Sequence, residues 1–361
     1  MLNINDHSNY IKICVDLAFS VVGKVSPNPY VACIIVLDGE IKSVGIHQGA
    51  GNPHAEVNAL NALPKCYDRS KCTLYVNLEP CCHFNKRTPP CAQLLIKEGI
   101  KKVVIGCLDP NPFVSGNGVK LLRDNGVEVL ENIENEISEK LNKIFFKNIN
   151  KKVPYFYGKI ASSLDGKISL LNGDSKWITG EKSRILVHDL RMQFDAIMVG
   201  KKTFLADLPS LNSRKNNNIQ KENIKIIVGN YKQIIPLINN DKKNFYIVIS
   251  QNKESNLNFS EIKIINDIKV IFYQNSIQEV FARLLEMGIC SVFVEGGGEL
   301  FTHFLEKNLL DEISIFKAPI IIGTGKGFSN SLDINSISES IKIKKIKYEQ
   351  LDNDIHITGI L

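Results

Sequence analysis

The 361-residue sequence lacks any apolar run near the ~18 residues that a membrane-spanning helix needs. Its first residues, MLNINDHSNY, do not combine a basic region with an apolar stretch, as a secretory signal does. It also has no Arg-rich block or basic arm, although Lys and Arg outnumber Asp and Glu by 44 to 38. We therefore expect a cytoplasmic protein that binds small anionic molecules and neither a membrane nor nucleic acid.

The composition excludes two further classes of protein. Hydrophobic residues make up 44% and charged residues 23%, so the chain should bury a core and not be disordered. The nine cysteines are an odd number in a chain far longer than a disulfide-stapled miniprotein. We interpret them as reduced thiols, and the crowding of Cys81, Cys82 and Cys91 indicates a metal site. Whether the chain forms a homo-oligomer stays open.

The order of apolar segments predicts an α/β fold in two domains, without internal repeats. The first domain should contain helices near residues 8–22, 54–63, 91–98, 118–125 and 131–150, and strands near 31–37, 41–46, 73–78, 102–107 and 127–130. The second should contain helices near 181–192, 277–287 and 299–307, and strands near 155–161, 196–200, 225–228, 245–249, 291–295, 313–316 and 341–348. Residues 214–223 and 239–244, rich in Lys and Asn, should be solvated loops. The boundary is expected near residues 151–154.

A histidine and a proline-cysteine pair carry the first functional signal. His54-Ala55-Glu56 starts a predicted helix, and Glu79-Pro80-Cys81 follows a predicted strand. One imidazole and two thiolates bind Zn²⁺ tetrahedrally and leave a fourth position open for water. This H-x-E…P-C order is typical of zinc deaminases, in which a carboxylate that does not bind the metal moves the proton. The pattern predicts that His54 and Cys81 bind zinc and that Glu56 is the proton shuttle.

The second thiolate departs from the short P-C-x-x-C form, because Phe84 stands at its position. Cys91 is the best replacement, since it starts a predicted helix whose N-terminus would stabilise a thiolate. Cys82 and His83 are alternative ligands. Cys82 is disfavoured because the side chains of neighbouring residues at a strand end diverge, and His83 is better suited to contact a substrate.

The segments around these residues resemble, in order, the deaminase half of the bifunctional riboflavin biosynthesis proteins. The matching segments are Val25–Val31, His47, Gly51, the HAE motif, EPC-x-H…TPPC and Asp109–Pro112. The resemblance implies a cytidine-deaminase-like α/β/α domain in which His54, Cys81 and Cys91 bind zinc and Glu56 moves the proton. It also implies substrate contacts for Asn28, His47, His83 and one basic residue of Lys86-Arg87, for which we choose Arg87.

Two departures from the family accompany this resemblance. Nine residues separate Cys81 from Cys91 where the family usually has eight, which leaves open whether Lys86 or Arg87 contacts the phosphate. Ala32 stands where the family commonly has glycine, and a methyl group is tolerable there.

A second group of segments lies in residues 151–361. It comprises KIASSLDGK (159–167), GDSKWIT (173–179) with the only tryptophan, Arg191, Asp195–Gly200, and Glu295-Gly296-Gly297-Gly298 between a predicted strand and helix. A glycine run there lets the backbone approach a pyrophosphate, or it is only a tight turn. The run is not G-x-G-x-x-G and comes late in its domain, so we do not expect a Rossmann unit.

These segments resemble the reductase half of the same family, which implies a dihydrofolate-reductase-like α/β domain that uses NADPH. By this resemblance NADPH would contact Ala161, Trp177, Thr203, Asp207, Gly297, Gly298, Glu299, Leu300, Phe301, Thr302 and His303. The substrate would contact Ser175, Arg191, Leu211, Arg214 and Glu295, with Arg214 at the 5′-phosphate. The general acid of the reduction is either Lys159 or Asp207. The resemblance does not extend over residues 215–279.

The resemblance implies a two-step enzyme acting on a pyrimidine ribose phosphate. Residues 1–150 would hydrolyse the 2-amino group of 2,5-diamino-6-ribosylamino-4(3H)-pyrimidinone 5′-phosphate, and residues 151–361 would reduce its ribosyl group to ribityl with NADPH. One alternative is a nucleoside or nucleic-acid deaminase with an unrelated C-terminal domain, which predicts aromatic stacking platforms and a basic stripe that the sequence does not show. Another is a zinc-stabilised binding module, which would need a fourth ligand and leaves Glu56 without a role.

Overall fold

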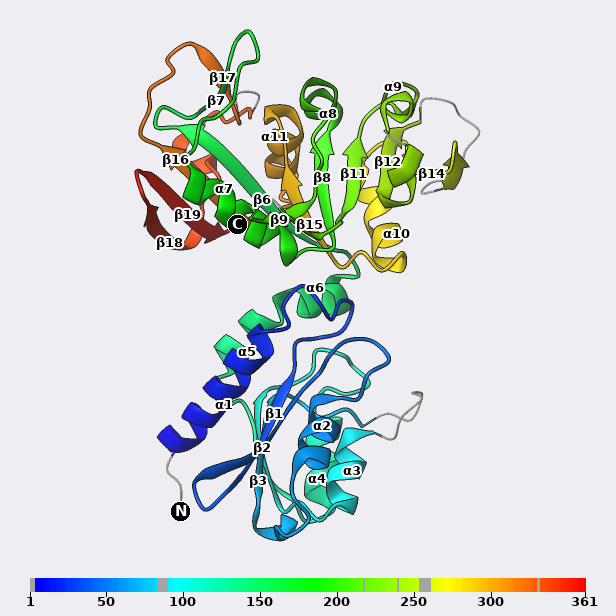
Figure 1. Ribbon diagram of the computed structural model, residues 1–361, viewed down its shortest axis with the longest axis vertical. Helices are drawn as coiled ribbons and strands as arrows, with labels where there is room; N and C mark the ends of the chain where they lie inside the picture. The colour runs from blue at the N-terminus through cyan, green and yellow to red at the C-terminus, as the bar shows by residue number, and fades with distance from the viewer. Residues whose placement is uncertain (1–3, 83–89, 217, 239, 253–260, 330–331) are drawn as a thin grey trace. The chain divides into compact units, whose positions relative to one another are not determined.

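The computed structural model describes residues 4–82, 90–216, 218–238, 240–252, 261–329 and 332–361 (Figure 1). Contacts divide the chain into two compact units, Met1–Lys152 and Val153–Leu361. Within the described ranges, no helix combines the length and the apolar character that crossing a bilayer requires.

The first unit contains a five-stranded sheet in the order β2-β1-β3-β4-β5. Strands β3, β4 and β5 are parallel to one another, whereas β1 is antiparallel to both β2 and β3. Its elements are α1 (Ile4–Phe19), β1 (Ala32–Leu37), β2 (Glu40–Ile46), α2 (Ala55–Ala62), β3 (Thr73–Leu78), α3 (Cys91–Lys97), β4 (Lys102–Cys107), α4 (Asn117–Asp124), β5 (Glu128–Leu130), α5 (Asn135–Leu141) and α6 (Lys143–Lys151), with one short 3₁₀ turn at Arg69–Lys71.

Alternating side chains of β1 separate the two faces of this sheet, because successive residues of a strand point to opposite sides. Cys33 and Ile35 lie in the core cluster shared with α2, α3 and α4. Ile34 and Val36 lie in the cluster shared with α1. Both faces are therefore covered by helices, α1 and α5 on one side and α2, α3 and α4 on the other (Figure 1). Every residue of β1 is apolar for this reason.

The last helical segment of this unit differs from its expectation. The sequence predicts one charged helix over 131–150, but the helix breaks at Asn142 into α5 and α6. Asn142 has φ −98° and ψ 18°, outside the helical range, and its side chain bonds a distant part of the chain. The helical periodicity of apolar residues in a sequence cannot reveal a tertiary hydrogen bond of this kind. At the other end of the unit, α1 starts at Ile4, so Ser8 lies inside the helix and donates to Glu134 instead of capping.

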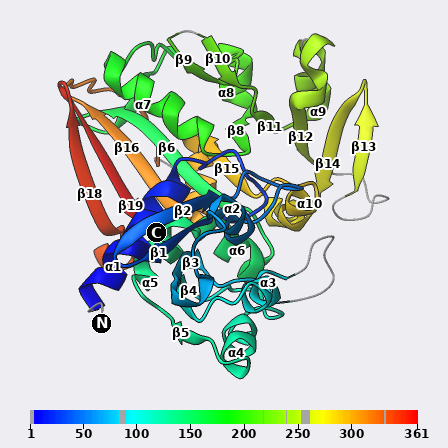
Figure 2. The ribbon, with the colours of Figure 1, turned by 60° about the horizontal axis from the view of Figure 1, so that its bottom comes forward.

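The second unit contains a ten-stranded sheet in the order β13-β14-β12-β11-β8-β15-β6-β16-β19-β18 (Figure 2). Its seven central strands are parallel, and β13, β19 and β18 are antiparallel at the edges. The strands are β6 (Tyr155–Ser163), β8 (Ala196–Gly200), β11 (Ile224–Val228), β12 (Tyr246–Gln251), β13 (Ile262–Ile265), β14 (Ile268–Tyr273), β15 (Ser291–Glu295), β16 (Glu312–Ala318), β18 (Lys344–Leu351) and β19 (Asp354–Ile360). The helices are α7 (Glu181–Met192), α8 (Lys201–Asp207), α9 (Tyr231–Ile234), α10 (Phe281–Glu286) and α11 (Gly298–Glu306).

The path of the chain creates a reversal in the middle of this sheet. From β6 the chain passes to β8, β11, β12 and β14 in turn, and then returns to insert β15 between β8 and β6. Strand β16 is added on the other side of β6. Ligands of open α/β sheets bind outside the carboxyl ends of the strands at such a reversal. Strands β8 and β15 end at Gly200 and Glu295, and Glu295 pairs with Lys159 in the middle of β6, so the fold brings these segments together.

Several elements of the second unit differ from the prediction. Residues 214–223 are not a loop: β9 (Ser213–Lys215) pairs antiparallel with β10 (Asn218–Lys221). Lys221 donates to the carbonyls of Met192 and Phe194, so tertiary contacts hold this polar segment. Residue 239 lies outside the described residues, and Asn240–Phe245 forms 3₁₀ turns. The elements α8, α9, β13, β14 and β19 were not predicted, nor was the pair β7 (Lys167–Leu170) and β17 (Gly325–Gly327).

Gly45 allows α2 to pack directly on β2. A methyl group at this position would lie 2.1 Å from Ala55 O and 2.3 Å from Ala59 N. We expect Gly45→Ala to lower the free energy of unfolding by ~1–3 kcal/mol, because a backbone cannot yield as a side chain does. Ser43→Ala is the matched control on the same strand, since Ser43 Oγ is buried and has no hydrogen-bond partner among the described residues. Denaturant titration measures both, and equal stability of the two variants would contradict the prediction.

Candidate functional site

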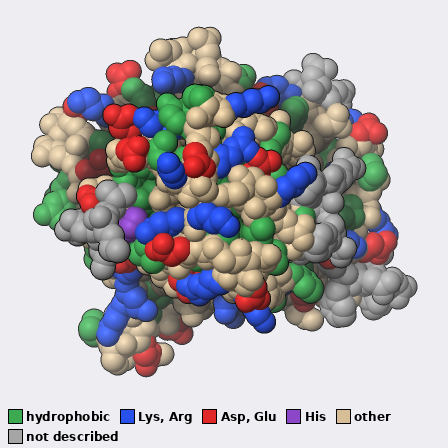
Figure 3. Space-filling model, turned by 90° about the horizontal axis from the view of Figure 1, so that it is seen from below, with side chains coloured by type: hydrophobic (Ala, Val, Ile, Leu, Met, Phe, Trp, Pro, Cys, Tyr) green, Lys and Arg blue, Asp and Glu red, His purple; other side chains and the backbone are tan. Residues whose placement is uncertain are grey.

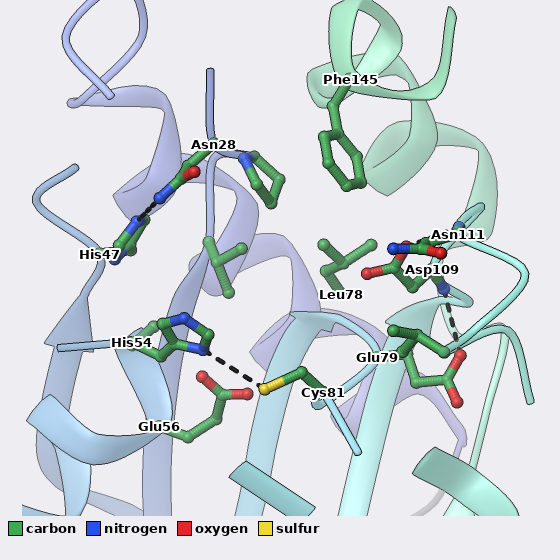
Figure 4. A pocket seen from close by; sticks show the side chains of 14 residues that line it. Asn28, His47, His54, Glu56, Leu78, Glu79, Cys81, Asp109, Asn111 and Phe145 are labelled. Atoms are coloured by element: carbon green, nitrogen blue, oxygen red, sulfur yellow. Dashed lines mark hydrogen bonds between the residues drawn. The ribbon is translucent and has the colours of Figure 1, made fainter. Parts of the chain in front are cut away.

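Three elements of the first unit bring one imidazole and two sulfurs together. His54 precedes α2, Cys81 follows β3, and Cys91 is the first residue of α3. His54 Nδ1 lies 3.6 Å from Cys81 Sγ and 3.2 Å from Cys91 Sγ, and the three atoms lie within 4.8 Å of one another (Figure 4). One nitrogen and two sulfurs at this spacing fit a tetrahedral Zn²⁺ with one position left for water.

The N-terminus of α3 acts on Cys81. The backbone N–H of Cys91 donates to Cys81 Sγ at 3.5 Å, and the N–H of Ala92 donates to the Cys81 carbonyl at 3.1 Å. A hydrogen bond from the Cys91 thiol and the neighbouring His54 hold the pKa of Cys81 well below its ordinary range, and the pKa of Cys91 is raised. We expected the helix N-terminus to stabilise the Cys91 thiolate. Instead, the backbone amide of Cys91 points to Cys81.

The alternative ligands lie elsewhere or outside the described residues. Cys82 Sγ contacts the carbonyl of Phe113 at 3.6 Å and does not belong to the metal-binding cluster. His83, Lys86 and Arg87 lie outside the described residues, so their predicted roles are untested.

Glu56 lies beside the cluster on the first turn of α2, where Figure 4 shows its carboxylate close to His54 and Cys81. Its side chain is only 3% exposed. Burial raises the pKa of the Glu56 carboxyl, and the negative charge of Cys81 adds to this effect, while His54 opposes it. A carboxyl group with a raised pKa next to an open metal position is suited to accept a proton and to release it again.

Asn28 and His47 form one wall of a pocket above the cluster. His47 Nδ1 lies 3.0 Å from the Pro53 carbonyl and therefore carries the hydrogen. Its Nε2 accepts a hydrogen bond from Asn28 Nδ2 at 2.8 Å. This chain of contacts orients the amide of Asn28, so that a polar group of fixed direction faces the pocket.

Across the pocket from them lie residues for which the sequence indicated no role: Leu78, Asp109, Asn111 and Phe145 (Figure 4). Val114 also lines the pocket. Asp109 and Asn111 belong to a segment that the sequence analysis quoted without a function. Phe145 stands in an aromatic pair, Phe145-Phe146, inside an otherwise charged helical segment, and that pair was the available signal.

Glu79 ties the segment after β4 to the metal-binding region. Its Oε2 accepts backbone N–H groups of Asp109 at 3.2 Å and Gly116 at 3.0 Å, and its Oε1 accepts that of Val119 at 3.1 Å. Gly118 must be glycine here, because a methyl group would lie 2.4 Å from Pro80 O. Glu79 therefore anchors the segment that supplies Asp109 and Asn111 to the pocket.

A charge cluster lies where the carboxyl end of β15 pairs with the middle of β6 in the second unit. Arg191 binds Glu295 with two hydrogen bonds, Nε to Oε1 at 2.7 Å and Nη2 to Oε2 at 2.6 Å, and also donates to the Asn212 carbonyl at 3.1 Å. Lys159 is the direct neighbour of Glu295 across the two strands. Burial lowers the pKa of Lys159, and Glu295 partly offsets this effect. An ammonium group with a lowered pKa can give up its proton readily.

Arg214 is half-buried beside this cluster. Its Nε donates to Asn212 Oδ1 at 2.9 Å and its Nη2 to Ser210 Oγ at 3.0 Å, while its backbone N–H donates to His188 Nδ1 at 3.2 Å. The guanidinium group is thus oriented before any ligand binds.

The glycine run after β15 brings the backbone close to two other segments. Gly297 N donates to Thr203 Oγ1 at 2.9 Å. A methyl group at Gly298 would lie 2.7 Å from the carbonyl of Gly327, and one at Gly296 would lie 3.7 Å from Gly200 N. The glycine run therefore allows close packing and also begins α11. Both interpretations from the sequence, a close approach to a pyrophosphate and a tight turn, are compatible with this structure.

The structure limits some of the predicted cofactor and substrate contacts. The side chains of Phe301, Thr302 and Leu211 are buried and at most 2% exposed, so for these residues only the backbone is available to a ligand. Trp177 is 72% exposed, with the Arg184 guanidinium 4.9 Å from its ring. Asp207 is exposed and lies 3.7 Å from the Lys176 ammonium. The others lie at or near the surface: Ala161, Ser175, Thr203, Leu300 and His303 are half-buried, and Glu299 is exposed and pairs with Lys202.

Comparison with known proteins identifies the family. Residues 4–107 match the cytidine and deoxycytidylate deaminase zinc-binding region, and residues 154–357 match the RibD C-terminal domain. The chain is 37% identical over 354 residues to the riboflavin biosynthesis protein RibD of Aquifex aeolicus, with 97% of each chain covered. It is 39% identical over 357 residues to RibD of Actinobacillus pleuropneumoniae, with 96% of this chain and 93% of the relative covered. The chain belongs to the RibD family.

Solved RibD structures resemble this one along the whole chain. A RibD structure from Acinetobacter baumannii has a TM-score of 0.88 at 32% identity, with 99% of each chain covered. A Thermotoga maritima protein described as a diaminohydroxyphosphoribosylaminopyrimidine deaminase/5-amino-6-(5-phosphoribosylamino)uracil reductase has a TM-score of 0.86 at 34% identity, again with 99% of each chain covered. The predicted family and fold class, a cytidine-deaminase-like domain followed by an α/β reductase domain, are confirmed. An unrelated C-terminal domain is excluded by the RibD C-terminal match.

Replacement of single cysteines separates the ligand from its neighbour. We expect the full chain to bind one Zn²⁺, Cys91→Ser to lose most of it, and Cys82→Ser to keep it, because Cys91 Sγ lies beside His54 Nδ1 and Cys82 does not belong to the cluster. Elemental analysis of the purified, dialysed variants measures the metal content. The ligand assignment is wrong if Cys82→Ser loses the metal and Cys91→Ser keeps it.

Proposed function

We propose that the RibD-family chain performs two consecutive steps of riboflavin biosynthesis, a zinc-dependent deamination in residues 1–150 and an NADPH-dependent reduction in residues 151–361. The substrate of the first step is 2,5-diamino-6-ribosylamino-4(3H)-pyrimidinone 5′-phosphate. The observation that carries the proposal is the placement of the buried Glu56 carboxyl next to His54, Cys81 and Cys91 at the bottom of a polar pocket.

In the deamination, His54 Nδ1 and the sulfurs of Cys81 and Cys91 would hold the metal. A bound Zn²⁺ lowers the pKa of water toward neutrality and so supplies a nucleophile. Glu56 would accept the proton of that water and transfer it to the departing amine, as its raised pKa favours. Asn28 and His47 would orient the pyrimidine through the amide that their hydrogen bond fixes.

In the reduction, the edge formed by β6, β8 and β15 would hold NADPH and the ribose phosphate. The bound nicotinamide supplies the hydride, and the chain supplies orientation and the proton. The N-terminus of α11, at Gly298, provides free backbone N–H groups suited to a cofactor phosphate. Arg214, oriented by Asn212 and Ser210, suits the planar contact that a 5′-phosphate favours.

Of the two candidates for the general acid, the structure favours Lys159 over Asp207. Lys159 lies in the centre of the sheet beside Glu295, where burial lowers its pKa. Asp207 lies at the end of α8, is exposed, and has Lys176 as its ionic neighbour. A half-buried ammonium group whose pKa is lowered can protonate the ring oxygen as the sugar opens.

The face shown in Figure 3 offers no support for a nucleic-acid deaminase. On the face shown in Figure 3, Lys and Arg side chains alternate with Asp and Glu side chains, and the described residues form no continuous basic stripe there. Binding to a nucleic-acid backbone depends on such a stripe. The small pocket above the metal-binding cluster suits a free pyrimidine phosphate instead.

Glu56→Gln tests the first step. We expect the variant to keep its zinc and to lose deamination by ~10²–10⁴-fold, because the amide cannot carry the proton. Reduction of the deaminated intermediate, supplied directly with NADPH, should continue at the wild-type rate. Chromatographic identification of the products separates the two activities. Loss of both activities in a folded Glu56→Gln protein would contradict the assignment of one reaction to each unit.

Lys159→Met and Asp207→Asn test the second step. We expect Lys159→Met to reduce kcat at saturating NADPH by at least ~10²-fold, and Asp207→Asn to change it little. A general acid must be protonated, so the wild-type rate should fall as the pH rises through the Lys159 pKa, which burial brings below the ordinary lysine value. The oxidation of NADPH, followed by absorbance, gives both results. A large loss in Asp207→Asn alone would transfer the role to Asp207.

A further inference from the structure

Two buried asparagines bind the backbone of one residue, Tyr30. The Tyr30 N–H donates to Asn142 Oδ1 at 2.7 Å, and its carbonyl accepts hydrogen bonds from Asn142 Nδ2 at 3.1 Å and Asn77 Nδ2 at 2.9 Å. Asn77 Oδ1 also accepts the N–H of Ala32 at 2.8 Å. Both asparagine side chains are 0% exposed. Tyr30 is thus held on both its backbone donor and its backbone acceptor.

The two asparagines act in place of a neighbouring strand. The ladder between β1 and β3 includes the pair Cys33 and Val76 but does not extend to Ala32 and Asn77. Beyond that point the side-chain amide of Asn77 supplies the donor and the acceptor that a backbone would supply in a sheet. The segment before β1 is fixed as firmly as a strand, although it belongs to no ladder.

Asn142 binds Tyr30 although its position at the start of α6 favours a hydrogen bond to its own helix. It occupies the N-cap of α6, where asparagine usually accepts a hydrogen bond from its own helix. Its side chain makes no such bond and binds Tyr30 across 112 positions of sequence. The first turn of α6 loses a cap as a result, so the contact serves the position of Tyr30 and not the stability of the helix.

The asparagine clamp, defined as Asn77 and Asn142, joins two walls of the pocket. Asn28 and Pro29 directly precede Tyr30, and Phe145 follows Asn142 on the first turn of α6. All three line the pocket, and Figure 4 shows Asn28 and Phe145 on opposite sides of it. The spacing between these walls therefore depends on a few hydrogen bonds to one backbone position.

We propose that Asn142 and Asn77 are positioning residues of the deaminase pocket, which set the distance between Asn28 and Phe145 and thereby the affinity for the pyrimidine substrate. This inference rests on the proposed deamination. The side-chain hydrogen bonds of the clamp go to Tyr30 and Ala32, whereas His54 and Glu56 belong to α2 and its N-cap. Loss of the clamp should therefore weaken substrate binding and leave proton transfer intact.

Asn142→Leu, in the full-length zinc-loaded chain, removes both side-chain hydrogen bonds of Asn142 to Tyr30 at nearly constant volume. We expect KM for the deaminase substrate to rise about 10-fold or more and kcat to stay within about 3-fold, since only binding common to the ground state and the transition state is lost. The zinc content should stay at one ion per chain. Unchanged KM in this folded variant, or a loss confined to kcat, would overturn the proposal.

Asn142→Asp is the milder variant, used if Asn142→Leu does not fold. It keeps the acceptor for the Tyr30 N–H and replaces the donor by an oxygen facing the Tyr30 carbonyl, so KM should again rise. Asn223→Leu is the matched control. Asn223 is also 0% exposed and donates to two backbone carbonyls, those of Arg191 and Phe194, but it belongs to the second unit. Its substitution should leave KM of the deamination unchanged, and an equal rise of KM would show a general effect of losing a buried amide and overturn the proposal.

A double-mutant cycle with Asn28→Ala distinguishes positioning from simple destabilisation. If the clamp acts through Asn28, the rise of KM caused by Asn142→Leu should shrink to less than about 3-fold in the Asn28→Ala background. If the increases in KM caused by the two single substitutions simply multiply in the double variant, Asn142 acts independently of Asn28, and the proposal is contradicted. A wild-type chain that does not deaminate the pyrimidine phosphate would instead refute the proposed function.

Discussion

The first unit depends on the meeting of three chain segments at a single set of donor atoms. His54 Nδ1 and the two sulfurs come from the start of α2, the end of β3 and the start of α3. A different contact brings each of these segments to the site. Gly45 lets α2 touch β2, the parallel strands β3 and β4 place their carboxyl ends together, and the amide of Cys91 draws Cys81 toward α3. A bound metal would thus cross-link the layers of the fold as well as activate water.

In the second unit, the ion pair between Arg191 and Glu295 has a structural importance comparable to that of the three donor atoms in the first. The side chains are 15% and 13% exposed, so both groups lose much of their hydration. Two parallel hydrogen bonds in the fork geometry of arginine offset this loss, which a single contact would not do. The carboxylate beside Lys159 is that of Glu295, and it already shares its negative charge with Arg191. Because that carboxylate offsets only part of the desolvation, the pKa of Lys159 stays lowered.

The sequence predicted the elements that have a periodic apolar pattern and failed where tertiary contacts decide. Strands β3, β4, β8 and β15 begin and end as expected, because buried strands of parallel sheets form continuous apolar runs between turn residues. The polar hairpin of β9 and β10 and the break at Asn142 have no such pattern, and distant groups stabilise both. The spacing of the motifs was enough to bring His54, Cys81 and Cys91 into one hypothesis. The pairing of Arg191 with Glu295 depends on packing that no local pattern encodes, and the aromatic pair that contains Phe145 does not by itself show that Phe145 lines the pocket.

The carboxylate of Glu79 has a consequence for how this pocket can diversify. It holds Asp109 at the beginning of a segment and Gly116 and Val119 at its end, so one side chain closes a loop of the main chain at both ends. Whatever lies between those anchors can change in sequence while the strands and the metal ligands stay in place. Asn111 and Val114 face the pocket from within that loop. Evolution can therefore exchange the contacts to the substrate as a module, separately from the chemistry that the strands and α2 preserve.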